Sequence, residues 1–197
     1  MSDDETLKVY ARKAQDYADL TNADSQANRL LTAFISALPQ AGHVLDLGCG
    51  PGTSAAVMAD AGFKVTATDA VPEMVNMAAQ HPGVTAKVAS FDDITGTAIY
   101  DGIWANFSLL HASREDMPRH LAALVTALKP NGIFHIGLKT GTGSKRDTLG
   151  RLYTYYTDAE LTGLLNDAGL TVTDRTTGRE KGLDGVDADW ISLRAHA

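Results

Sequence analysis

The chain has 197 residues, a formal net charge of −7 and 44% hydrophobic residues, which is the composition of a globular domain. The acidic balance argues against an obligate nucleic-acid partner, because phosphate backbones need a clustered positive field. No apolar stretch approaches the ~20 residues of a membrane helix, and residues 1–5 lack the pattern of a secretion signal. One cysteine cannot form a disulfide within the chain. We therefore expect a cytoplasmic protein with neither a nucleic-acid nor a membrane partner.

The N-terminal part predicts two helices. Residues 6–20 and 24–38 each carry apolar side chains at helical spacing, and Pro39 ends the second stretch. We expect residues 1–40 to form a helical segment that packs on the rest of the chain, with its first helix contributing to a lid. The core would then span residues 41–197.

Strands and helices alternate through that core, and this alternation is typical of a parallel, doubly wound α/β sheet in a single domain, residues 1–197. Strands are predicted at 43–47, 63–68, 84–88, 100–105, 132–138, 170–176 and 189–195, and helices at 53–61, 72–80, 114–128 and 158–168.

The most informative stretch is VLDLGCGPG at residues 44–52. An apolar strand ends at a carboxylate and breaks into alternating glycines, and a helix follows. Open α/β sheets bind their ligands at such a turn, beyond the carboxyl ends of the strands. Glycine permits positive φ there and lets the backbone approach a ligand closely. The turn therefore predicts a cofactor site formed by Asp46, Gly48, Cys49 and Gly50.

A second carboxylate, Asp69, ends the next strand 21 positions after Gly48. This is near the ~20-residue spacing at which an acid accepts both hydroxyls of a ribose. A dinucleotide site is disfavoured, because Thr53 replaces its third glycine and Asp46 would repel a pyrophosphate. Asp46 suits a positively charged ligand instead, such as S-adenosylmethionine with its sulfonium and ammonium groups.

At these residues the chain resembles the class I S-adenosylmethionine-dependent methyltransferases, whose first motif is similar to residues 44–52. The resemblance continues through residues 84–92, 100–111 and 128–136, and it covers nearly all of 41–197. It implies a seven-stranded Rossmann-like sheet in the order 3-2-1-4-5-7-6, with the last strand antiparallel, and S-adenosylmethionine as cofactor. It also implies that Ala70, Met74, Ser90, Phe91, Asp92 and Asn106 contribute to cofactor binding.

The adenine pocket departs from the pattern of the family. Many relatives place an Asp after the third strand to accept from the adenine amino group, and alignment puts Ser90 at that position. We expect Ser90 to face the adenine edge, since a hydroxyl also accepts hydrogen bonds. Asp92 is the alternative acceptor, and the N–H of Phe91 would meet the ring nitrogen in either case.

The acceptor side is less strongly marked. Residues 139–147 predict a glycine- and hydroxyl-rich loop at the ligand end of the sheet, where specificity usually resides. Lys139, Arg151 and Tyr153 are the candidate substrate residues, suited to a flat or carboxylate-bearing acceptor. The alternative is that the tyrosines only pack under the loop while Arg151 is solvated.

Catalysis needs a general base only if the acceptor must lose a proton. His111 ends the fourth-strand motif near the expected acceptor, and Tyr10 and Tyr17 belong to the possible lid, so these three are the candidates. No metal site is expected, because the remaining histidines have no partners at metal spacing.

The sequence thus predicts transfer of a methyl group from S-adenosylmethionine to a small-molecule acceptor by direct in-line displacement. Two alternatives remain: a non-catalytic cofactor-binding or regulatory protein, and a nicotinamide-dependent oxidoreductase. The sequence leaves open the acceptor, the atom that is methylated and the oligomeric state.

Overall fold

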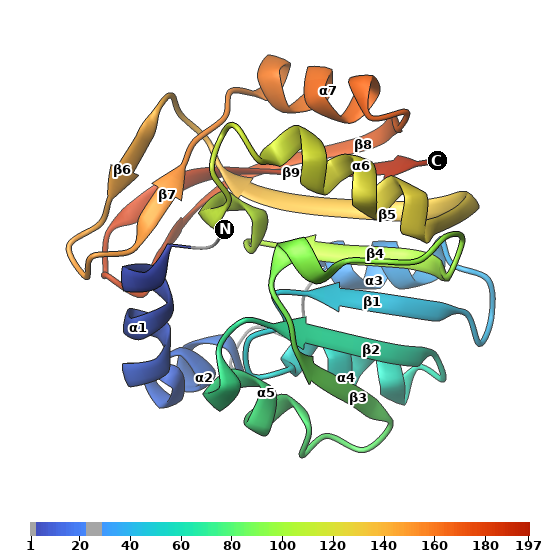
Figure 1. The fold of residues 1–197 in the computed structure, drawn as a ribbon, viewed down its shortest axis with the longest axis horizontal. Helices are drawn as coiled ribbons and strands as arrows, with labels where there is room; N and C mark the ends of the chain where they lie inside the picture. Colours follow the sequence, from blue (N-terminus) through green and yellow to red (C-terminus); the bar gives the residue numbers. More distant parts are fainter. Residues whose placement is uncertain (1–2, 23–28) are drawn as a thin grey trace.

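The computed structural model describes residues 3–22 and 29–197. One sheet forms its centre (Figure 1), with the strand order β3 (Val84–Val88), β2 (Lys64–Asp69), β1 (His43–Leu47), β4 (Tyr100–Asn106), β5 (Leu128–Lys139), β9 (Asp187–His196) and β8 (Thr171–Lys181). The first five strands of that order pair in parallel, and β9 is antiparallel to both β5 and β8. This is the predicted order, with the last strand of the chain antiparallel.

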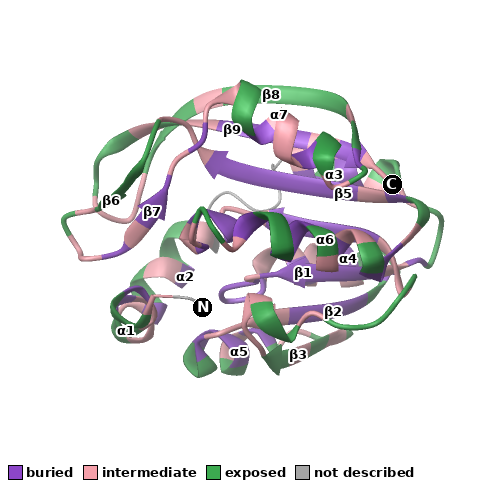
Figure 2. Cartoon of the chain, turned by 45° about the horizontal axis from the view of Figure 1, so that its top comes forward, coloured by how far each residue is buried: buried purple, intermediate pink, exposed green. Residues whose placement is uncertain are grey.

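Helices cover both faces of the sheet, as a doubly wound fold requires. On one face lie α3 (Arg29–Ser36), α4 (Thr53–Asp60) and α5 (Pro72–Ala78), whose apolar side chains pack on β1 and β2. On the other lie α6 (Met117–Ala127) and α7 (Asp158–Asp167), packed on β4, β5 and β9. The central strands are buried and the outer helix faces are exposed (Figure 2).

The N-terminal segment differs from the prediction. The expected helix over 6–20 is two helices, α1 (Asp4–Arg12) and α2 (Ala14–Asn22), separated at Lys13, which caps α1. A one-residue break preserves the spacing of the apolar side chains, and both helices contribute to the same small cluster on α5, so periodicity alone does not reveal it. The expected helix at 24–38 corresponds to α3, and its first residues lie outside the described part of the chain.

The predicted loop at 139–147 is partly wrong as well. β6 (Ser144–Arg146) pairs with β7 (Leu152–Thr154) in a small antiparallel sheet. Other strands are longer than predicted, because β8 and β9 extend past the core as a hairpin and β5 begins at Leu128. Helix α6 begins later than expected, since Ser113 and Asp116 form a hydrogen-bonded turn before it.

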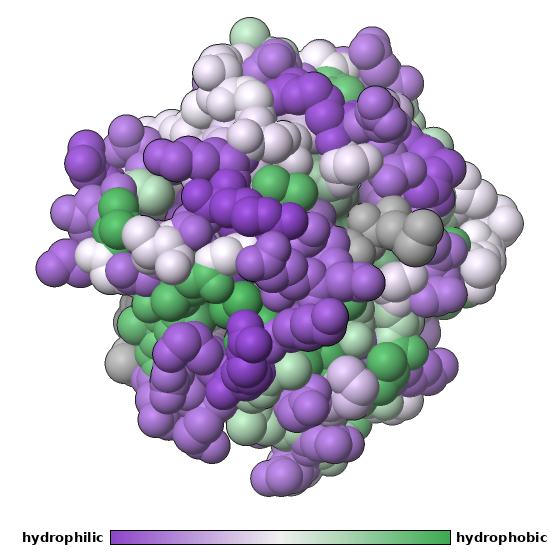
Figure 3. Space-filling view, turned by 60° about the vertical axis from the view of Figure 1, so that its left-hand side comes forward, coloured by the Kyte–Doolittle hydropathy of each residue, from purple (hydrophilic) through white to green (hydrophobic). Residues whose placement is uncertain are grey.

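These elements place the site at one edge of the sheet. β1, β2, β4 and β5 all run toward α1 and the β6–β7 pair, which lie beyond their carboxyl ends at the left of Figure 1. The face seen from that side is mostly hydrophilic, with hydrophobic residues showing between the polar ones below its centre (Figure 3). Within residues 3–22 and 29–197, no helix has the length and hydropathy needed to cross a membrane.

Candidate active site

The turn after β1 contains three glycines, Gly48, Gly50 and Gly52, with φ of 68°, 53° and 86°. Other residues rarely adopt this left-handed region. The N–H of Gly48 donates to the carbonyl of Thr68 at 2.7 Å, which ties the turn to the end of β2. A Cβ on Gly48 would collide with the side chain of Ser108. The turn is therefore a bare backbone surface whose shape depends on glycine.

Asp69 ends β2 beside this turn. Its two carboxylate oxygens accept from the N–H groups of Gly50 and Val71, each at 2.9 Å. Burial raises the pKa of Asp69, and these backbone donors oppose that shift by favouring the charged form. Each oxygen retains another acceptor site. The carboxylate is thus fixed in place and still able to accept hydrogen bonds from a ligand.

A small cavity of about 70 Å³ opens beside Asp69, at the ends of β1, β2 and β3. Its walls combine the glycine turn, the start of α5 and the segment after β3. Seven of the predicted cofactor residues line it, namely Gly48, Gly50, Asp69, Ala70, Met74, Ser90 and Phe91.

The two candidate adenine acceptors differ in position. Ser90 lines the small cavity, and its hydroxyl donates to Asp93 at 2.8 Å while accepting from the N–H of Asp92 at 3.2 Å. Ser90 thereby caps the short helix η1 (Phe91–Asp93). Asp92 is not among the residues that line the cavity, and its carboxylate lies 2.6 Å from Arg119. The geometry is more favourable to Ser90 than to Asp92.

A second, larger cavity of about 870 Å³ lies on the other side of the glycine turn. Asp46 lines it from β1, and this side chain is 3% exposed. The Oδ2 atom of Asp46 is buried without a hydrogen-bond partner. Burial, with a smaller contribution from Asp69, raises the pKa of Asp46 to about 7. A backbone hydrogen bond from Ala55 opposes this shift, but a buried carboxylate oxygen without a partner remains costly, so this position favours a cationic ligand.

The two cavities share a boundary formed by Tyr10, Tyr17, Gly48 and Phe107. Tyr17 lies directly over the glycine turn, where a Cβ on Gly50 would be 3.1 Å from its ring. Tyr10 and Tyr17 meet edge to face at 5.5 Å. The N-terminal helices therefore supply aromatic rings at the place where the cavities join.

Tyr10 and His111 form a hydrogen-bonded pair. The Tyr10 hydroxyl lies 3.0 Å from His111 Nε2, and His111 Nδ1 lies 2.7 Å from the carbonyl of Leu152. A carbonyl only accepts, so Nδ1 carries the proton, and Nε2 accepts from Tyr10. Burial lowers the pKa of His111 to about 4 and raises the pKa values of Tyr10 and Tyr17. All three candidate bases are therefore uncharged near neutral pH.

Arg151 is buried, which contradicts the alternative that it is solvated. Its Nε donates to Asp147 Oδ2 at 2.8 Å, and its Nη1 donates to the Tyr10 hydroxyl at 3.0 Å. Both Arg151 and Asp147 have almost no exposed side-chain surface. Arg151 thus fixes the Tyr10 hydroxyl so that its proton points to His111.

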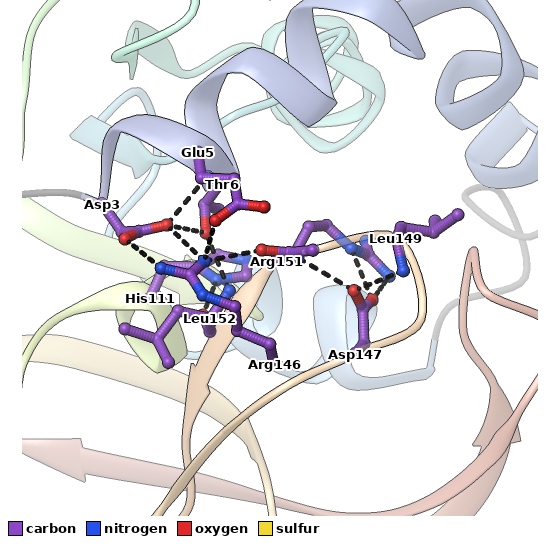
Figure 4. A network of polar contacts seen from close by, with 10 residues as sticks. Asp3, Glu5, Thr6, His111, Arg146, Asp147, Leu149, Arg151 and Leu152 are labelled. Atoms are coloured by element: carbon purple, nitrogen blue, oxygen red, sulfur yellow. Dashed lines mark hydrogen bonds and ion pairs between the residues drawn. The ribbon is translucent and has the colours of Figure 1, made fainter.

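A second group of contacts ties α1 to the β6–β7 pair (Figure 4). Arg146 donates to both carboxylate oxygens of Asp3, at 2.8 and 2.9 Å, and lies 3.2 Å from Glu5. The N–H of Leu152 donates to the Thr6 hydroxyl at 2.8 Å. These hydrogen bonds and ion pairs therefore hold the start of α1 against the β6–β7 pair, which also contains Tyr153.

Three residues of the larger cavity come from the opposite wall. Lys139 ends β5, and its ammonium lies 4.2 Å from the centre of the Tyr153 ring. Trp190 of β9 pairs directly with Lys139 across the sheet, and it too lines the cavity. Sequence reasoning missed Trp190 and Asp147. The antiparallel register that brings Trp190 beside Lys139 joins residues far apart in the chain and leaves no local signal.

The remaining predicted residues are accounted for as follows. Asn106 ends β4, lines the larger cavity and accepts from His135 Nε2 at 3.1 Å. Cys49 lines the same cavity from within the glycine turn, and burial raises the pKa of its thiol. No cluster of His, Cys, Asp or Glu in the described ranges could hold a metal ion. The structure brings the predicted cofactor residues together, with Asp92 at the outside.

The known sequences that are similar to this chain are methyltransferases. A family model described as a methyltransferase domain matches residues 44–132. Trans-aconitate 2-methyltransferase of Delftia acidovorans is 36% identical over 107 residues, which are 50% of this chain and 38% of that protein. A ubiquinone biosynthesis O-methyltransferase of Methylobacterium nodulans is 27% identical over 154 residues, 68% of this chain and 61% of that protein. The chain thus spans less than two thirds of these curated relatives.

Comparison with solved structures gives the same fold. The 1,6-didemethyltoxoflavin-N1-methyltransferase of Burkholderia thailandensis, solved with 1,6-didemethyltoxoflavin and S-adenosylhomocysteine, superposes with a TM-score of 0.79 and 24% identity. The match covers 98% of this chain and 87% of that one. The strand order, the glycine turn at its centre and the matched domain lead to one conclusion. Residues 44–132 match a methyltransferase domain, and the chain has the fold of the class I S-adenosylmethionine-dependent methyltransferases.

Proposed function

We propose that this chain transfers a methyl group from S-adenosylmethionine to a small-molecule acceptor. The observation that carries the proposal is the pair of cavities that meet at the glycine turn. One cavity contains a fixed carboxylate, Asp69, and the other contains a buried carboxylate, Asp46, whose Oδ2 has no partner. Such a pair suits a ligand with a ribose at one end and a cationic group at the other.

The described residues fit S-adenosylmethionine in three places. Asp69 would accept from the ribose hydroxyls, since both of its oxygens are already oriented by backbone donors. Asp46 would accept from the ammonium group and so gain the partner that its Oδ2 lacks. Ser90 and the N–H of Phe91 would meet the adenine edge. The glycine turn leaves the backbone bare between them, where a side chain would exclude the ligand.

When bound, S-adenosylmethionine supplies a methyl group already activated by its sulfonium, so the protein mainly has to align the acceptor with it. Tyr10, Tyr17 and Phe107 form an aromatic boundary between the cavities. Aromatic faces attract a cation and exclude water. Because His111 is uncharged at neutral pH, it adds no repulsive charge beside a sulfonium. Tyr10 and His111 are proposed to orient the reacting groups, and a proton transfer through them is the alternative.

Labelled methyl transfer tests this proposal. S-adenosylmethionine with a labelled methyl group is incubated with the protein and a cell extract, and the extract is then divided into small-molecule and macromolecular fractions. We expect label in the small-molecule fraction. The Gly48→Val variant is the control, and it should transfer none because its side chain collides at the turn. Label confined to protein or nucleic acid, or none above the control, would refute the proposal.

A further inference from the structure

Lys139 is a cation of the inner wall of the larger cavity. Its side chain is half-buried and lines the cavity at the end of β5, with its ammonium over the Tyr153 ring. No carboxylate in the described ranges lies within 4 Å of its ammonium. Asp184 is a neighbour beyond that distance, since a Cβ on Gly182 would be 2.8 Å from Asp184 Oδ1 and 3.3 Å from Lys139 Nζ. The other buried cation of the wall, Arg151, is already paired with Asp147. Among the described residues of the inner wall, Lys139 is therefore a cation without a direct ion pair.

Trp190 adds an unused donor beside this charge. Directly paired residues of antiparallel strands share a face of the sheet, so Trp190 and Lys139 project to the same side. The next partner across the sheet is Gly178, where a Cβ would collide with the indole ring. The ring can therefore lie flat over β8. Its Nε1 is buried without a hydrogen-bond partner, although indole N–H groups usually find one when buried.

The wall formed by Lys139, Trp190 and Tyr153 favours one kind of ligand. An ammonium without a direct ion pair and an indole N–H without an acceptor both favour an anionic oxygen, and the rings of Trp190 and Tyr153 present flat apolar surfaces. The outer rim does not repeat the pattern. Asp174, Glu180 and Lys181 line the cavity there, so both signs of charge are present.

We propose that the acceptor is a flat molecule with an anionic oxygen group, typically a carboxylate, which Lys139 and the indole N–H of Trp190 hold at the end of β5. This rests on the proposed methyltransferase function and names its substrate class. The anion is the anchor and not the methylated atom, because Lys139 and Trp190 line the larger cavity and neither lines the smaller one. The atom that receives the methyl group would lie at that boundary, beside Tyr10 and Phe107.

The transfer itself balances without another reactant. A lone pair of the acceptor atom forms the new bond to the methyl carbon, and the carbon–sulfur bond breaks with its electrons going to sulfur. The sulfonium becomes a neutral thioether. If the acceptor atom is a hydroxyl, its proton leaves to solvent or through Tyr10, and the anchored anion keeps its charge throughout.

Calorimetry on the protein loaded with S-adenosylhomocysteine tests the class of acceptor. The probes are 4-hydroxybenzoate and indole-3-carboxylate, each compared with its uncharged amide. We expect the carboxylates to bind more tightly than the amides by at least tenfold, and Lys139→Met to remove that preference. Lys139→Arg should keep most of it, and Trp190→Phe should reduce it a few-fold, since the ring remains and the donor is lost.

Lys145→Met is the matched control, because Lys145 is exposed on β6 and lines neither cavity. It should leave every affinity unchanged. Equal binding of carboxylate and amide, an unchanged preference in Lys139→Met, or no binding of either carboxylate at millimolar concentration would overturn the inference. Failure of S-adenosylhomocysteine itself to bind would instead refute the proposed function, so the two failures are distinguishable.

Discussion

At the scale of single residues, Asp46 shows how a binding site costs stability. Its pKa in the folded protein is raised to about 7, above the value of 3.8 for an unperturbed Asp. A raised pKa means that the folded state holds its proton more tightly, so stability falls as pH rises from about 4 to 7. Asp46→Asn removes this cost. At pH 8 the ligand-free variant should be more stable than the unmodified protein, by on the order of 1 kcal/mol or more.

Chemical denaturation at pH 8 and at pH 4 measures this effect, and the gain should nearly vanish at the lower pH. The same variant should bind S-adenosylmethionine more weakly. Loss of stability at pH 8 would show that the contacts of Asp46 outweigh the cost of its buried charge, and it would remove the electrostatic argument.

Proton release is a second consequence of the raised pKa of Asp46. An ammonium group bound beside Asp46 favours the charged carboxylate, so binding should expel the proton that Asp46 carries below about pH 7. Calorimetric titrations at pH 6.5, in buffers with different ionisation enthalpies, should therefore show release of a fraction of a proton. Asp46→Asn is the control, and its binding enthalpy should not depend on the buffer.

Among the predicted cofactor residues, we expect Asp69 to have a large effect on cofactor affinity. A carboxylate that accepts from hydroxyls contributes about 1.5–3 kcal/mol through each charge-assisted bond. Asp69→Ala should weaken binding of S-adenosylmethionine at least tenfold, as measured by calorimetry. The variant also loses the bonds to Gly50 and Val71, so circular dichroism must first show that the fold is intact. Unchanged affinity in a folded variant contradicts the assignment.

Substitution of His111 distinguishes two possible roles of this residue, namely orienting the reacting groups and transferring a proton. With its pKa lowered to about 4, it stays neutral across the physiological range, and its two nitrogens already bond to Tyr10 and Leu152. Gln can replace a donor and an acceptor, so His111→Gln should keep kcat within about tenfold and leave the pH profile flat from 6 to 8. A loss beyond a hundredfold, together with a shifted profile, would establish proton transfer.

At the scale of elements, Arg146 of β6 connects the β6–β7 pair to α1 through ion pairs with Asp3 and Glu5. The charged partners are partly exposed, so each contact adds little to global stability. They restrain α1, which carries Tyr10 over both cavities. Arg146→Ala should leave the melting temperature nearly unchanged but speed hydrogen exchange in residues 4–12 and speed release of S-adenosylhomocysteine a few-fold. Unchanged exchange and release rates would exclude this role.

The elements also show how far sequence reasoning reaches. β1, β2 and the glycine turn were predictable from the sequence. Their apolar strand patterns and turn-forming glycines are local features, and they favour the same structure as the final fold. The β6–β7 pair was not predictable, since its strands are short and are fixed by Thr6 from the distant α1. Trp190 was missed for a similar reason. Its role depends on a register with Lys139 that only the assembled sheet creates.

Within the site, Arg151 illustrates the same limit. Its i, i+4 spacing from Asp147 is compatible with an exposed pair, and the sequence left a solvated Arg151 open as one alternative. The structure buries both side chains under Tyr10 and Tyr153. A buried ion pair of this kind must be closely matched to offset desolvation. Only tertiary packing shows that its function is to hold the Tyr10 hydroxyl.

At the scale of the whole molecule, the sheet order brings the ends of five parallel strands to one edge, and the N-terminal helices lie over it. Two cavities result, a small one beside Asp69 and a larger one lined by Asp46. The central claim is that this edge binds S-adenosylmethionine and not a dinucleotide. The most direct measurement is calorimetric titration of the unmodified protein with S-adenosylmethionine, S-adenosylhomocysteine and NAD at pH 8. We predict saturable one-to-one binding of the first two and none of NAD. Tighter binding of NAD, or no binding of S-adenosylmethionine, would contradict the account.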